Sequence, residues 1–122
     1  MIILFYFSSE DGTGEMLQRI MTRFTAAAEV KVFRNWGIFV KNLMKPRVNT
    51  AIAVILLSQR EELLDAVSVR DLIHEYKLIL ILPDKEEETI SLAHSLRPNF
   101  MTYKMGNLHE LEIVLKKMLR RD

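Results

Sequence analysis

The segment Ala51-Ile52-Ala53-Val54-Ile55-Leu56-Leu57-Ser58 decides the fold of this chain. Seven apolar residues in a row, closed by a polar one, are typical of a strand that is covered on both faces at the centre of a parallel sheet. The runs Ile2 to Phe7 and Leu78 to Leu82 have the same character. Three such runs predict a sheet whose central strands lie between two layers of helices.

Amphipathic stretches separate these strands and predict the rest of the array. Val30 to Phe33 alternates with Lys31 and indicates a short strand at an edge, and Phe100 to Tyr103 is expected to be the last strand. Apolar residues at helical spacing predict five helices. They are expected over residues 16–24, over 38–45 before Pro46, over 63–73, from about Glu86, and from about Asn107 as N-cap.

Five strand and helix units without a linker predict one domain over residues 1–122. The expected fold is a flavodoxin-like, doubly wound, five-stranded parallel sheet in the order 2-1-3-4-5, with five helices. In such a sheet, ligands and chemistry lie beyond the carboxyl ends of the strands, here between the first and third strands. The side chains expected at that edge are Ser8, Ser9, Glu10, Ser58, Pro83, Asp84 and Lys104.

Composition narrows the classes of function. The formal net charge is +1 with both signs well mixed, and no basic patch with interleaved aromatic residues indicates nucleic-acid binding. Without cysteine the chain has no disulfide, thiolate nucleophile or thiolate metal site. The apolar run Ile2 to Phe7 is too short for a signal sequence or a membrane span. We expect a cytoplasmic protein that binds neither nucleic acid nor membrane.

The passage Lys104-Met105-Gly106-Asn107-Leu108-His109-Glu110-Leu111 is similar to the Lys-Pro-aromatic-Asn-Leu-x-Glu-Leu passage of response regulator receiver domains. The order of elements extends this resemblance over nearly the whole chain. Lys104 falls on the lysine of that family. The family holds a divalent metal with an acidic pair after its first strand and accepts a phosphoryl group on an Asp after its third.

This chain departs from the receiver pattern where the chemistry would take place. The acidic pair is replaced by Ser8 or Ser9, the acceptor by Ser58, and the hydroxyl switch residue by Leu82 or Pro83. Neutral serines are poor ligands for a hard divalent cation, and a serine hydroxyl without a base is a poor nucleophile. The resemblance therefore implies a pseudo-receiver: Ser8, Ser9, Glu10, Ser58 and Lys104 line a degenerate pocket with no catalytic residue, cofactor or metal.

With its chemistry lost, such a domain is expected to act in bacterial signal transduction through protein–protein interaction. The resemblance implies that the fourth helix, fifth strand and fifth helix present the binding face, either to a protein partner or to a second copy. The residues expected on this face are Thr89, His94, Tyr103, Glu112 and Lys116. The basic tail that also includes Lys117, Arg120 and Arg121 is expected to be a solvated helix end.

Two alternatives remain open. Glu10 and Asp11 are carboxylates of the first loop that would rescue a metal site if both turned inward toward Ser58. The loop from Ser9 to Gly14 is also similar in outline to the FMN phosphate loop of flavodoxins, and Trp36 and Tyr103 would be the stacking rings. Carboxylates in that loop oppose a phosphate dianion. His74, His94 and His109 lie on three different predicted helices and lack metal-ligand spacing.

Overall fold

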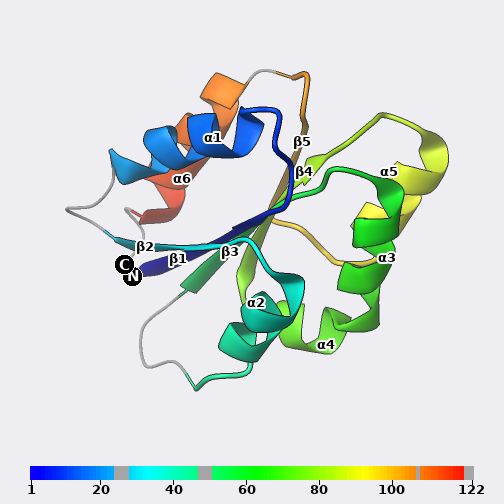
Figure 1. Cartoon of the computed structure of the whole chain (residues 1–122), viewed down its shortest axis with the longest axis horizontal. Helices are drawn as coiled ribbons and strands as arrows, with labels where there is room; N and C mark the ends of the chain where they lie inside the picture. The colour runs from blue at the N-terminus through cyan, green and yellow to red at the C-terminus, as the bar shows by residue number, and fades with distance from the viewer. Residues whose placement is uncertain (24–27, 47–50, 107, 120–122) are drawn as a thin grey trace.

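The computed structural model describes residues 1–23, 28–46, 51–106 and 108–119. Its core is one five-stranded sheet in the order β2-β1-β3-β4-β5 in which all neighbours are parallel, as the sequence predicts (Figure 1). The strands are β1 (Ile2–Phe7), β2 (Glu29–Phe33), β3 (Ala51–Leu56), β4 (Lys77–Leu82) and β5 (Phe100–Tyr103). The predicted edge position of the second strand is confirmed.

Helices cover both faces of the sheet (Figure 1). The helices α1 (Thr13–Thr22) and α6 (Leu108–Leu119) pack on one face. The other face carries α2 (Trp36–Leu43), α3 (Arg60–Ser68), α4 (Arg70–Ile73) and α5 (Glu87–His94). Among the described residues, no helix has the length and apolar character needed to cross a membrane.

The central strands are buried because their side chains alternate between two apolar layers. Every residue of β1 and β3 is buried. In β1, Ile3, Phe5 and Phe7 contact the layer under α1 and α6, whereas Leu4 and Tyr6 contact the layer under α2 to α5. A strand with apolar residues at every position therefore stabilises both layers at once.

The helix count differs from the predicted five, because the described residues form six. The stretch expected to be one helix over 63–73 is divided at Val69, whose backbone angles of φ −118° and ψ 27° lie outside the helical region. Val69 is β-branched, and Ser68 just before it donates its hydroxyl to the carbonyl of Asp65 at 2.6 Å. Both features weaken a helix interior. Asn107, the expected N-cap of the last helix, and Phe24 lie outside the described residues.

Close packing at the start of α1 brings the backbone of Gly14 against the ring of Phe7. A Cβ atom at this position would overlap that aromatic ring. Phe7 is 1 % exposed, and its ring is also stacked on that of Phe5 at 5.0 Å between centroids. The ring has little room to move, so α1 reaches the sheet only because residue 14 has no side chain.

We expect Gly14→Ala to destabilise the protein by about 1–3 kcal/mol, because the added methyl group overpacks a rigid aromatic contact. Urea unfolding followed by circular dichroism measures this loss. In a Phe7→Leu background the smaller side chain leaves room, and the same substitution should cost less. Equal costs in the two backgrounds would show that Phe7 is not the obstacle.

Candidate functional site

The carboxyl ends of β1 and β3 place two serines side by side. Phe7 and Leu56 are register partners at the ends of these strands, and Ser8 and Ser58 follow shortly after them. Their Oγ atoms lie 3.5 Å apart. The predicted meeting of Ser8 and Ser58 at this edge of the sheet is therefore confirmed.

A carboxylate that the sequence reasoning did not single out lies between these serines. Glu62 Oε1 accepts a hydrogen bond from the backbone N–H of Ser58 at 2.7 Å, and Oε2 accepts one from the Ser8 hydroxyl at 2.6 Å. The Tyr6 hydroxyl also donates to Oε2 at 3.3 Å. Three donors from two strand ends therefore converge on one carboxylate.

Glu62 reaches this position because of where it stands in α3. Gln59 is the N-cap residue, which makes Glu62 the third residue of the helix. A glutamate at that position commonly turns back to a free N–H before the helix, as in a capping box. The spacing from Gln59 to Glu62 is visible in the sequence, but the donated hydroxyls come from residues more than fifty positions away.

The other predicted pocket residues do not join this cluster. Lys104 Nζ forms an ion pair with Asp11 Oδ2 across the loop after β1. Glu10 is exposed, and the Ser9 Oγ atom is buried with no hydrogen-bond partner among the described residues. Asp11 also accepts the N–H of Thr13 at 3.0 Å through Oδ1, so it turns toward the start of α1 and toward Lys104.

Charge pairing changes the acidity of Asp11. The hydrogen bond from Lys104, followed by the N–H of Thr13, lowers the pKa of this carboxyl from 3.8 to about 2. The Tyr6 pKa is raised above its usual 10.0, chiefly because its ring is buried, and the nearby Glu62 charge adds to the rise. Asp11 is therefore ionised under all ordinary conditions and neutralises Lys104.

Arg34, which follows the edge strand β2, fastens the loop after β1. Its guanidinium carbon lies 4.1 Å from the centre of the Phe7 ring. Its Nε donates to the Phe7 carbonyl at 2.9 Å, and Nη2 donates to the Ser9 carbonyl at 3.3 Å. The side chain thereby satisfies carbonyls that the sheet leaves open beyond β1.

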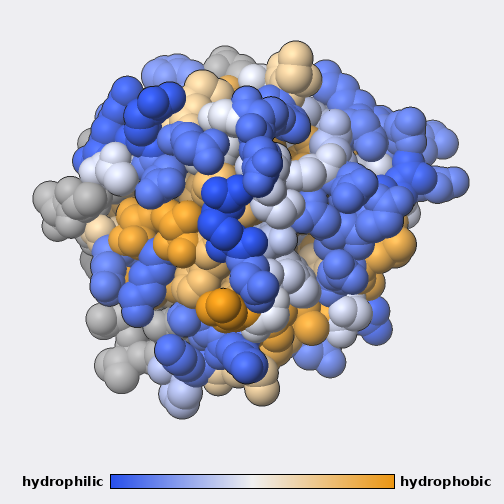
Figure 2. Space-filling view, in the orientation of Figure 1, coloured by the Kyte–Doolittle hydropathy of each residue, from blue (hydrophilic) through white to orange (hydrophobic). Residues whose placement is uncertain are grey.

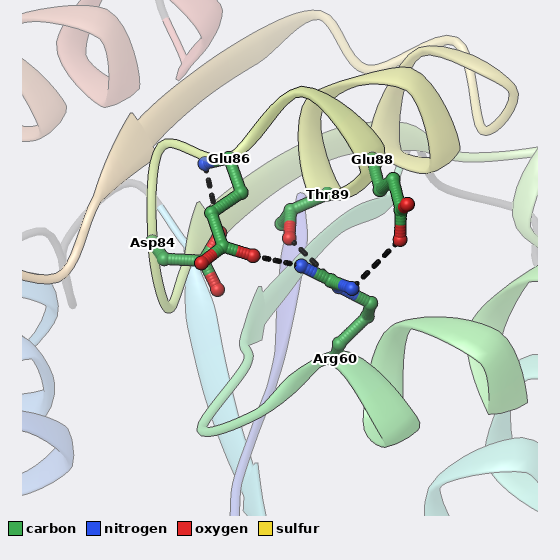
Figure 3. Close-up of polar contacts among 5 residues, drawn as sticks. All are labelled: Arg60, Asp84, Glu86, Glu88 and Thr89. Carbon is green, nitrogen blue, oxygen red and sulfur yellow. Dashed lines mark hydrogen bonds and ion pairs between the residues drawn. The ribbon is translucent and has the colours of Figure 1, made fainter.

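A second arginine, the first residue of α3, connects that helix to the start of α5 (Figure 3). Arg60 Nε donates to Thr89 Oγ1 at 3.2 Å, and its two Nη atoms form ion pairs with Glu88 at 2.8 Å and with Glu86. Asp84 accepts the Glu86 N–H at 3.0 Å. The pKa of Asp84 is lowered by the hydrogen bond from the Thr89 hydroxyl, then by the Glu86 N–H and by the nearby Arg60 charge. Asp84 thus has the turn role that the sequence suggests.

The two rings considered for stacking on a flavin already have contacts. Trp36 lies edge-on to Tyr6 at 5.1 Å between ring centroids and against Phe39 at 5.5 Å. The Lys85 ammonium lies 4.9 Å from the centre of the Tyr103 ring. Each of the two rings is therefore already contacted on at least one side.

The described residues contain no group of three or more His, Asp or Glu side chains that would hold a metal ion. His94 lies on α5 and His109 on α6, while His74 follows α4 and has its Nε2 3.4 Å from the Ser95 carbonyl. Asp11, one of the two carboxylates considered for a rescued metal site, contacts Lys104 instead.

Comparisons with family models, with curated proteins and with solved structures found no match for the chain. What this edge of the sheet can do therefore rests on its own chemistry. At this edge the Glu62 carboxylate holds the hydroxyls of Tyr6 and Ser8, and the Asp11 carboxylate neutralises the Lys104 ammonium. Two arginines, Arg34 and Arg60, bind the neighbouring segments.

Replacing Glu62 with Gln should destabilise the protein by about 1–3 kcal/mol, because the amide nitrogen cannot accept the hydrogen bonds that one carboxylate oxygen now receives. Chemical denaturation measures the loss, and the Ser58 amide proton resonance should move. Glu61→Gln is the matched control, since it removes the same charge one residue earlier on an exposed position and should change stability by less than about 0.5 kcal/mol. Equal effects of the two substitutions would contradict the bridging role of Glu62.

Replacing Lys104 with Met should raise the Asp11 pKa from about 2 toward 3.8, with the Thr13 N–H preventing a full return. Because the folded-state pKa is the lower one, the ion pair stabilises the fold above about pH 4, and this contribution is lost as the pH falls toward 2. Carboxyl-carbon NMR titration of Asp11 measures the shift.

Lys85→Met is the control for that titration, since Lys85 contacts the Tyr103 ring and not Asp11. It should leave the Asp11 pKa in place. An unchanged pKa in the Lys104 variant would mean that the ion pair does not form in solution.

Proposed function

We propose that this chain is a receiver-like domain that accepts no phosphoryl group and acts in cytoplasmic signal transduction by binding another protein. The observation that carries the proposal is the Glu62 carboxylate, which occupies the donors beside Ser58 at the end of β3. Ser58 stands where a receiver has its phosphoryl acceptor. The hydrogen-bond donors that would orient an incoming phosphoryl group, the Ser8 hydroxyl and the Ser58 N–H, already donate to the Glu62 carboxylate.

Electrostatics in this pocket oppose phosphoryl transfer. A phosphoryl donor would bring negative charge toward Glu62, and like charges at short distance repel strongly where water is partly excluded. Lys104, the cation that would offset this charge, is paired with Asp11. Glu62 does contact the Ser8 hydroxyl, but a carboxylate is a weak base for a serine. We therefore assign no catalytic step to this edge.

The conformational switch of a receiver also lacks its parts. Leu82, at the end of β4, is buried and has no hydroxyl. The nearest hydroxyl on the next helix, Thr89, is 0 % exposed and bound to Arg60. Tyr103 is covered on one side by Lys85. A domain built this way would keep one conformation and offer a constant surface.

The binding face that we propose follows the β5 edge, with α5 and α6 on either side of it. His94 and Lys116 are exposed, and Tyr103 is partly so. Two residues expected on this face are not available there. Thr89 is buried beneath Arg60, and Glu112 is mostly buried and paired at 3.2 Å with Arg23, the C-cap residue of α1. The face is therefore narrower than the sequence suggests.

An amide-resolved NMR titration with magnesium at about 10 mM, followed by beryllofluoride, tests the proposal. We expect no saturable shift at Ser9, Ser58 or Lys104, because the pocket lacks a metal-binding carboxylate pair and an acceptor. Saturable shifts at these three amides would restore a phosphorylation switch and overturn the proposal.

The protein-binding part has its own experiment. A partner captured by the immobilised chain should be lost with Lys116→Glu and retained with Arg19→Glu, a matched charge reversal on α1. Loss with both variants would indicate a general charge effect and not a binding face at β5.

A further inference from the structure

The outer side of α2 is apolar and basic. Ile38 is 57 % exposed and Met44, which follows the helix, is 63 % exposed. Lys41 and Lys45 are exposed beside them, and residues 36–46 contain no acidic side chain. Phe39 and Leu43 point the other way, into the core. We call Ile38, Lys41, Met44 and Lys45 the basic stripe.

The outer side of α3 has the opposite charge. Glu61 and Asp65 are exposed on it, and Leu64 between them is 51 % exposed. Residues 61–69 contain no basic side chain, and Arg60 is committed to Glu86 and Glu88. We call Glu61, Leu64 and Asp65 the acidic stripe. Of the six large apolar side chains exposed among the described residues, three lie on the two stripes.

Both stripes face away from the same side of the sheet. Phe39 and Leu43 of α2 and Leu63 and Ala66 of α3 belong to one apolar layer, so the opposite sides of both helices face outward there. Figure 1 shows α2 and the α3 to α4 segment along this side of the sheet. In Figure 2, hydrophobic surface lies among hydrophilic side chains in the region of α2, whereas the surface over α3 and α5 is mostly hydrophilic.

We propose that a second copy of this chain docks on this side, so that the basic stripe of each protomer contacts the acidic stripe of the other. The charges favour a second copy because one chain carries both halves of a complementary surface, and among the described residues no ion pair joins the two stripes within it. A two-fold axis between α2 and α3 would use each pairing twice, as a closed symmetric dimer requires. Leu64 would then meet Ile38 and Met44, which removes apolar surface from water.

This dimer does not depend on the proposed function. It uses α2 and α3, whereas the proposed partner face lies at β5, so each proposal can fail without the other. A dimer formed on α2 and α3 would leave two β5 edges free for partners.

Sedimentation equilibrium of the full chain at low and high salt tests the proposal. We expect a species of twice 14.3 kDa that weakens as salt is raised, since paired surface charges are screened. Two reversed variants should each be monomeric at concentrations where the native chain is dimeric: Lys41→Glu with Lys45→Glu, and Glu61→Lys with Asp65→Lys. Their dissociation constants should rise about tenfold or more.

Mixing the two reversed variants gives the decisive result. In a mixed dimer both contacts again join opposite charges, so dimers should return at a one-to-one ratio. Leu64→Ala should weaken the native dimer without changing the circular dichroism spectrum. Lys116→Glu with Lys117→Glu, an equal charge change on α6, should leave the dimer intact.

A chain that stays monomeric at low salt and about millimolar concentration overturns the proposal. So does a dimer that the α6 variant breaks and the stripe variants do not, or a mixture that fails to restore association. If anionic vesicles bind the native chain but not the Lys41→Glu, Lys45→Glu variant, and the two reversed variants stay monomeric when mixed, the basic stripe serves a membrane surface and the dimer is rejected.

Discussion

Burial of three wholly apolar strands between two helical layers is the constraint on which the rest of this structure depends. β1, β3 and β4 expose almost no side chain on either face, so helices must cover both sides of the sheet. The parallel pairing that follows brings all carboxyl ends to one edge. Ser8 and Ser58 meet at that edge, and Lys104 follows β5 at the same edge, because the core requires the strands to run in the same direction.

At this edge most polar groups of the described residues are satisfied by one another, and the buried Ser9 Oγ atom is the exception. Glu62 receives the donors at the ends of β1 and β3, and Asp11 neutralises Lys104. Arg34 and Arg60 add bonds from the sides, the first to the carbonyls of Phe7 and Ser9 and the second to the first turn of α5. Loops held by so many internal contacts have little unmet capacity for a ligand. These internal contacts support the proposed function, in which the domain acts through its outer surface.

Sequence reasoning succeeded for the elements with strong local signals. The apolar runs predicted all five strands, and Pro46 and the turn residues around Asp84 marked ends that the structure reproduces within a few residues. It missed the break at Val69, where a weak local preference and the Ser68 hydroxyl outweigh helical spacing. It placed Thr89 on a binding face, although tertiary packing buries that residue under Arg60. Helical periodicity alone does not tell which polar residue a neighbouring helix will cover.

The amino-acid sequence by itself determined the order of strands and helices, the burial of β1, β3 and β4, and the absence of an Asp at Ser58. These follow from side-chain polarity and spacing along the chain, which act locally. Only the tertiary structure decided that Glu62 would bridge Ser8, Ser58 and Tyr6, and that Asp11 would contact Lys104 while Glu10 stayed exposed. Apart from the local bond between Glu62 and Ser58, those contacts join residues more than fifty positions apart. Their geometry exists only after the parallel sheet has brought the loop ends together.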